Sequence, residues 1–250
     1  DSRLKEMRES AKDGAVIGWH IKAPAGAGKT FVALHFMLEA MRKDPFARVL
    51  FVAANPALSL FVARWVAARV PRGRTQRKNR RALLGRLRVM SATREPRAVD
   101  VGDDDNNTIV EAPVDPSAGE ERYSLIVLDE AHHACLDEKL LASVLEHRRR
   151  GGEDGAGARL MLLSDVSQAT VEMEEKFPDG LREILLEEVV RSSKRIVAGA
   201  SAFQLGGDKI MLTRCHHESE GPPLKSYVFP KVKSGEEDAA ACYARFTVKG

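Results

Sequence analysis

One short segment, Ala23–Thr30, constrains the fold of this 250-residue chain more than any other feature. Gly26 and Gly28 can adopt positive φ angles and allow close backbone approach, so that successive N–H groups surround phosphate oxygens. Lys29 adds a cation for the β- and γ-phosphates, and the Thr30 hydroxyl can ligate Mg²⁺. The strict pattern has glycine where Ala23 stands, but the remaining spacing is kept. The residues expected to cradle nucleotide phosphates are Pro24, Ala25, Gly26, Ala27, Gly28, Lys29 and Thr30.

The segments around this loop alternate between strand-like and helix-like patterns. An apolar run at 16–21 leads into the loop, and residues 30–41 place apolar side chains on one helical face. This context favours a phosphate-binding loop over a glycine turn with a surface lysine. Further strands are expected at 48–54, 88–90, 123–128 and 159–163. Strands that alternate with helices indicate an α/β fold with a parallel sheet flanked by helices.

Asn55-Pro56 ends the second expected strand, and a helix through Leu60 and Val66 follows it. Phe61 and Trp65 lie at helical spacing with Leu58, so we expect them in the core rather than stacked on bases. Pro178-Asp179-Gly180 forms the next strong break. We therefore expect an ATP-binding domain over 1–180 and the beginning of a second α/β domain over 181–250. The chain does not begin with Met, which suggests a fragment in which the second domain is incomplete.

Two acidic residues follow the expected strand that ends at Leu128. Asp129 and Glu130 come directly after four apolar residues, at the carboxyl edge where open α/β sheets bind ligands. We expect Asp129 and Thr30 to hold Mg²⁺, and Glu130 to act as the general base that orients the attacking water. Together with the upstream loop, these acids predict hydrolysis of ATP.

Several motifs resemble those of helicases. Asp129-Glu130-Ala131-His132 spells the DEAH box, and Ala23–Thr30 is similar to the Walker A variant of helicase superfamilies one and two. Ser91-Ala92-Thr93 precedes the box, whereas superfamily two has this motif after it. The order best resembles the schlafen-type helicase domain, a divergent UvrD-like branch of superfamily one, over about residues 16–230. The resemblance implies a RecA-like P-loop NTPase.

Two later motifs extend the resemblance and supply further site residues. Ser164-Asp165-Val166-Ser167-Gln168 is similar to the third superfamily-one motif, Gly-Asp-x-x-Gln, and implies that Gln168 senses the γ-phosphate or the attacking water. Residues 186–197 resemble the motif that opens the second domain, which makes Arg191 the arginine that reaches the γ-phosphate. The catalytic residues expected on this basis are Lys29, Glu130, Gln168 and Arg191. The family's adenine-reading glutamine and its last two motifs are missing.

Charge and cysteine content constrain the partners less. The run from Arg72 to Arg88 contains no acid, and either contacts nucleic-acid phosphates or forms a solvated loop that faces the acidic stretch after Asp100. Cys135, Cys215 and Cys242 are few and widely spaced, which predicts neither a disulfide framework nor a zinc site. Apolar runs are too short to span a membrane. These features favour an intracellular protein, cytoplasmic or nuclear.

Two functions remain open from the sequence. The first is an ATP-hydrolysing motor domain of a superfamily-one-like DNA or RNA helicase or translocase, which acts on single-stranded DNA or RNA. The second is a nucleotide-dependent switch or scaffold that binds ATP and Mg²⁺ and acts through protein partners. Motors and switches share the same loop and acids, so nucleic-acid stimulation of hydrolysis distinguishes them.

Overall fold

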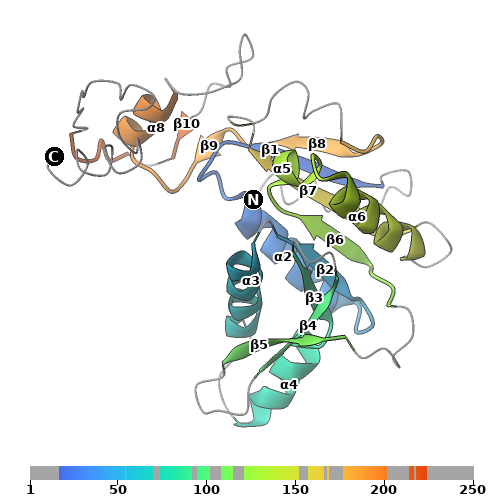
Figure 1. Cartoon of the computed structure of the whole chain (residues 1–250). Helices are drawn as coiled ribbons and strands as arrows, with labels where there is room; N and C mark the ends of the chain where they lie inside the picture. The colour runs from blue at the N-terminus through green and yellow to red at the C-terminus, as the bar shows by residue number, and fades with distance from the viewer. Residues whose placement is uncertain are drawn as a thin grey trace, which may run out of the picture.

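An eight-stranded sheet forms the centre of the molecule (Figure 1). The computed structural model describes residues 17–53, 55–69, 74–91, 95–101, 108–114, 121–151, 157–165, 168, 177–201, 214–216 and 218–223. The strand order is β5-β4-β3-β2-β6-β7-β1-β8. The strands are β1 (Gly18–Ala23), β2 (Val49–Val52), β3 (Leu87–Met90), β4 (Arg97–Val101), β5 (Ile109–Pro113), β6 (Leu125–Leu128), β7 (Arg159–Asp165) and β8 (Arg182–Leu185).

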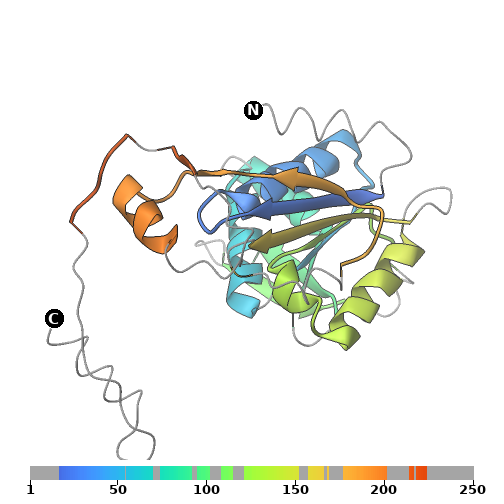
Figure 2. The same cartoon turned by 90° about the horizontal axis from the view of Figure 1, so that it is seen from above.

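Helices cover both faces of this sheet. They are α2 (Lys29–Lys43), α3 (Pro56–Ala68), α4 (Arg74–Leu84), α5 (Ala131–Ala134) and α6 (Glu138–Arg150). Figure 2 shows α2 on one face and α5 and α6 on the other. A second parallel pair, β9 (Glu188–Val189) and β10 (Arg214–Cys215), lies with helix α8 (Lys194–Ser201) to one side of the large sheet (Figure 1). Within the described ranges, no helix is long and apolar enough to cross a membrane.

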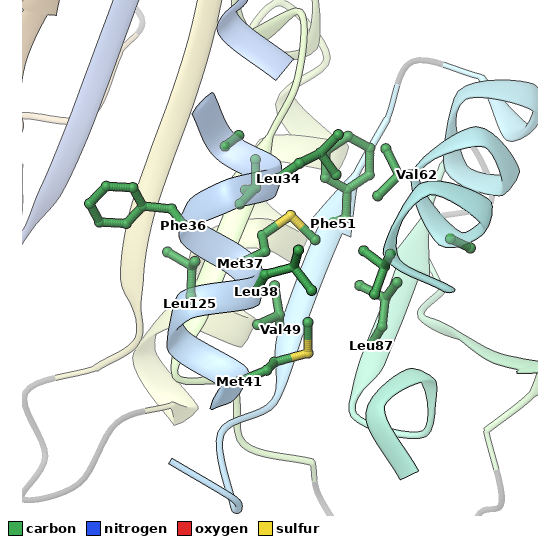
Figure 3. Close-up of a cluster of buried hydrophobic side chains, with 14 of the residues drawn as sticks. Leu34, Phe36, Met37, Leu38, Met41, Val49, Phe51, Val62, Leu87 and Leu125 are labelled. Atoms are coloured by element: carbon green, nitrogen blue, oxygen red, sulfur yellow. The ribbon is translucent and has the colours of Figure 1, made fainter. Parts of the chain in front are cut away.

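The two faces of the sheet bury separate apolar clusters. On the α2 side, Met37 and Leu38 pack against Phe51 of β2 and Val62 of α3 (Figure 3). On the other side, side chains of β2, β6 and β7 pack with α5 and α6. Every residue of β2 and β6 is buried, which explains why these strands are continuous apolar runs rather than alternating ones.

The predicted α/β fold is confirmed, with differences at the two edges of the sheet. Six strands run parallel, but β4 and β5 form an antiparallel extension beside β3. Of the two interpretations of the basic run, the solvated loop is wrong for residues 74–84, which form α4. Arg81 of this helix lies 3.5 Å from Asp100, and contact with nucleic-acid phosphates stays a prediction. At the other edge β8 pairs with β1, so the large sheet continues to Leu185, past residue 180. The division into two domains stays a prediction.

The expected core position of Phe61 is wrong. This side chain on α3 is 55% exposed, although Val62, Ala63 and Val66 of the same helix are fully buried. Trp65 is partly buried and packs against the core cluster. The helical spacing was correct, but the apolar stripe of α3 is wider than the face that the sheet covers.

The buried carboxylate of Glu121 links several side chains at the end of the sheet opposite the nucleotide loop. Glu121 accepts hydrogen bonds from Arg48 (2.8 Å), from Arg88 (2.8 Å to Nε) and from the Tyr123 hydroxyl (3.1 Å). Burial, followed by the Glu121 charge, raises the pKa of Tyr123. This cluster joins the starts of β2 and β3 to the start of β6.

We expect Glu121→Ala to lower the free energy of unfolding by about 3 kcal/mol, because it leaves the buried Arg88 guanidinium without its counter-charge. Urea denaturation measures this loss. Glu146→Ala is the matched control, since Glu146 accepts from Arg149 and Arg150 on the exposed surface of α6 and its removal should change stability little. Equal effects of the two substitutions would contradict a structural role for the Glu121 cluster.

Candidate nucleotide-binding site

The loop between β1 and α2 has the backbone that phosphate binding requires. Gly26 (φ 80°) and Gly28 (φ 90°) both lie in the left-handed region, which strains any residue with a Cβ. Gly28 caps α2, and the first turn of this helix contains no acidic residue. The positive end of the helix dipole therefore faces the loop without a competing carboxylate.

Lys29 is held inside the loop. Its side chain is 8% exposed, and Nζ donates to the carbonyl oxygens of Ala23 (3.1 Å) and Pro24 (3.4 Å). Nζ also lies 3.7 Å from Oδ2 of Asp165. The strand register produces this approach, because Ala23 at the end of β1 lies opposite Asp165 at the end of β7. The cation is thus held between the carboxyl ends of β1 and β7.

Thr30 and Asp129 meet although they are far apart in the sequence. The Thr30 hydroxyl donates to Asp129 Oδ2 at 3.1 Å, and the other carboxylate oxygen accepts from the backbone N–H of Glu130 at 2.9 Å. Asp129 is 2% exposed, and this burial raises its pKa. Two oxygen ligands at one point fit Mg²⁺, which usually takes one or two protein oxygens and completes its shell with phosphates and water.

Glu130 has an unusual backbone. With φ 50° and ψ 45° it is the only non-glycine residue with positive φ in the described part of the chain, and it is the N-cap of the short helix α5. Its side chain is 39% exposed, and Oε2 lies 3.4 Å from Nε2 of His132. A left-handed glutamate costs about 1–3 kcal/mol, and such strain clusters at functional sites.

His132 connects the two acidic motifs. Nδ1 of the fully buried ring accepts a hydrogen bond from the backbone N–H of Asp165 (3.2 Å), so Nδ1 carries no proton. Burial lowers the pKa of His132, which keeps the imidazole neutral with its proton on Nε2, towards Glu130. His132 therefore fixes the end of β7 relative to the turn that holds Glu130.

Asp165 is the residue that sequence reasoning undervalued. The same oxygen that lies near Lys29 accepts a hydrogen bond from Gln168 Nε2 at 3.2 Å. Gln168 itself is exposed. The Asp-x-x-Gln spacing contained this signal, but Asp165 was not placed among the expected site residues.

Arg191 lies against the phosphate loop. The N–H of Val190 donates to the carbonyl oxygen of Gly26 at 3.1 Å. A Cβ placed on Gly26 would stand 3.3 Å from Cβ of Arg191 and 3.4 Å from Val189. Gly26 is thus needed both for its φ angle and for this close approach. The structure brings the residues expected to act in catalysis to one edge of the sheet.

Ser164, which stands where the third motif has glycine, forms a buried polar pair with His20. Ser164 Oγ lies 2.6 Å from Nε2 of His20 on the neighbouring strand, and the His20 ring packs edge-on against Phe177 at 4.4 Å. Burial, with a smaller contribution from Lys22, lowers the pKa of His20 to about 4. No local sequence pattern indicates this pair, because it depends on which strands are neighbours in the sheet.

The His20 shift predicts acid sensitivity. The unfolded chain protonates His20 near its ordinary pKa of 6.5, whereas the folded chain does so only near 4. The unfolded state therefore binds more protons between these values, and stability is lost as pH falls through this window, by at most about 3 kcal/mol. Urea denaturation at several pH values should show a shallower acid-side slope for His20→Gln. Parallel slopes for variant and wild type would contradict the assignment.

The fold and these contacts define a helicase-like P-loop NTPase domain. The chain belongs to the ResIII family, described as "Type III restriction enzyme, res subunit", whose family model matches residues 2–149. No curated protein matches the chain at a significant level.

Solved helicase structures are similar to the chain at low identity. They are the Hef helicase domain of Pyrococcus furiosus (20% identity, TM-score 0.43, 73% of this chain and 38% of that one), Pif1 of Bacteroides sp. (12%, 0.38, 84% and 47%) and Pif1 of Candida albicans (12%, 0.35, 74% and 39%). The chain spans less than half of each of these proteins.

Proposed function

We propose that this chain binds ATP with Mg²⁺ and hydrolyses it as the motor domain of a superfamily-one-like DNA or RNA helicase or translocase, of the schlafen type that its motifs resemble. The supporting observation is the junction of Lys29, Asp165 and Gln168, which joins the phosphate loop to the third motif through one carboxylate oxygen. A surface lysine beside a glycine turn would have no reason to meet this pair.

Each residue has a defined part in hydrolysis. The loop N–H groups and Lys29 would hold the β- and γ-phosphates, while Thr30 and Asp129 would hold Mg²⁺. The metal would neutralise charge on the phosphates. Glu130 orients the attacking water and takes its proton as the water oxygen bonds to the γ-phosphorus and the bond to the ADP oxygen breaks.

Two further side chains respond to the γ-phosphate. Gln168 is positioned through Asp165 to sense the γ-phosphate or the water. Arg191, next to Gly26, is the candidate for stabilising charge in the transition state. Because Arg191 belongs to the segment that is proposed to begin a second domain over 181–250, its approach would couple hydrolysis to domain movement.

A phosphate-release assay on this chain, with and without single-stranded DNA or RNA, tests the proposal. We expect hydrolysis that depends on Mg²⁺ and rises when either polymer is added at low salt. ATP binding with no stimulation across a salt series would instead favour the nucleotide-dependent switch or scaffold. The proposed motor acts on intracellular nucleic acid, in the cytoplasm or the nucleus.

A further inference from the structure

Aromatic side chains gather on the outer side of α2 and α3. Phe31 and Phe61 are 52% and 55% exposed, although both lie on helices that cover the sheet. Phe31 and His35 of α2 meet Trp65 of α3 with ring centroids 6.0 and 5.5 Å apart. Phe61 precedes Trp65 by one helical turn and shares its face. The Arg69 guanidinium lies 4.0 Å from the Trp65 ring centroid. We call Phe31, His35, Phe61, Trp65 and Arg69 the aromatic surface.

The charged residues of α3 and α4 have one sign, whereas α2 carries Glu39 one turn after His35, paired with Lys43. Every charged residue from Asn55 to Arg94 is arginine or lysine, and this stretch covers α3, α4 and β3. Arg64 and Arg69 are exposed on α3 or at its end, and Lys78 is exposed on α4, which contacts α3. The first turn of α2 likewise contains no acid.

We propose that the aromatic surface binds a single-stranded nucleic acid, with bases stacked on Phe31 and Phe61 and the phosphate backbone held by Arg69 and the neighbouring cations. The inference rests on the proposed motor function and specifies where the strand lies. Base stacking needs exposed aromatic faces, and binding of the phosphate backbone needs nearby cations. A purely apolar partner would account for the rings but not for the exposed cations of α3 and α4.

The position of Phe31 gives the surface a route to the nucleotide. Phe31 directly follows Thr30, the residue whose hydroxyl meets Asp129. A base stacked on Phe31 would therefore order the first turn of α2, from which Lys29 and Thr30 project. Strand binding at this place predicts a higher rate of hydrolysis.

Titration of fluorescein-labelled oligothymidylate and oligouridylate with the whole chain tests the surface. We expect Phe61→Ala to raise Kd about 10-fold through loss of one stacked base. Phe61→Tyr should restore binding. Arg69→Ala should reduce the slope of log affinity against log salt by about 0.7, the value for one phosphate contact with a single strand. Oligonucleotide should quench the fluorescence of half-buried Trp65 while buried Trp19 is unaffected.

Matched controls lie elsewhere on the molecule. Phe46 is 86% exposed in the turn between α2 and β2, and Lys139 is an exposed cation on α6, on the other face of the sheet. Phe46→Ala and Lys139→Ala should bind as wild type does. Equal oligonucleotide affinity of Phe61→Ala and wild type would overturn the proposal. It would also be overturned if Phe61→Ala abolished self-association of the chain in sedimentation experiments and kept its oligonucleotide affinity, because the aromatic surface would then bind a second copy of the chain.

The experiments distinguish a failure of the proposed motor function from a failure of the proposed aromatic surface. If oligonucleotide affinity depends on Phe61 and Arg69 in a chain that hydrolyses no ATP, the surface stands and the motor function does not. If oligonucleotide stimulates hydrolysis equally in wild type, Phe61→Ala and Arg69→Ala at the same half-saturating concentration, the motor function stands and the surface is wrong.

Discussion

Replacing Lys29 by alanine is expected to reduce ATP affinity at least about 100-fold, to the point where binding is no longer detected. Hydrogen bonds to charged groups contribute about 1.5–3 kcal/mol each, and Lys29 would make more than one to the β- and γ-phosphates. The side chain is already confined in the loop by the Ala23 and Pro24 carbonyl oxygens. Little further side-chain entropy is therefore lost when it binds phosphate.

Isothermal titration with a non-hydrolysable ATP analogue measures the effect of Lys29→Ala. Lys29→Met keeps the length of the side chain and removes its charge, so it separates lost packing from lost electrostatics and should bind as weakly as the alanine variant. Lys43→Ala is the control at the other end of α2, where Lys43 pairs with Glu39 on the surface. Wild-type affinity in the methionine variant would show that the loop binds without this cation.

The sequence was informative where a local pattern carries the chemistry. Gly26, Gly28 and Lys29 were identified from spacing, and the structure shows the positive φ angles that the spacing requires. Residues 125–128 were identified as a buried strand because they are apolar throughout. Such features depend on a few consecutive residues, so they can be predicted without knowledge of the fold.

The remaining features depend on which strands are neighbours. Asp165 meets Lys29 only because β7 pairs with β1 in a register that sets Asp165 opposite Ala23. His20 and Ser164 form a buried pair for the same reason. No spacing within either strand encodes the order of the sheet, so these contacts were not predictable.

The edges of the fold were missed for a different reason. Helix α4 is dominated by arginine, and its sparse apolar residues Leu83 and Leu84 come only at its end. Arginine has good helix propensity, but a run without apolar periodicity gives no sign of the face that packs. Phe61 shows the converse, since a correct period does not say how wide a stripe the sheet will cover.

Glu130 combines an acidic side chain with a strained backbone, and the two can be separated by substitution. The left-handed φ angle of Glu130 turns the chain after β6. The Asp129 carboxylate accepts from Thr30, whereas the Glu130 carboxylate lies near His132 instead. The Glu130 carboxylate is less buried than that of Asp129, and its nearest described partner is His132. This placement suits a base that must reach a water molecule, whereas the buried Asp129 suits a metal ligand.

We expect Glu130→Gln to leave ATP affinity unchanged and to lower the turnover number about 10²–10⁴-fold, the usual contribution of a general base. Single-turnover phosphate release and titration of ATP measure the two quantities. Glu130→Gly should be equally inactive yet more stable by about 1 kcal/mol, because glycine adopts the left-handed conformation without strain. Glu138→Gln, an exposed change in the first turn of α6, should alter neither quantity. Unchanged turnover in the glutamine variant would remove Glu130 from the mechanism, and the strain at this residue would then have a purely structural explanation.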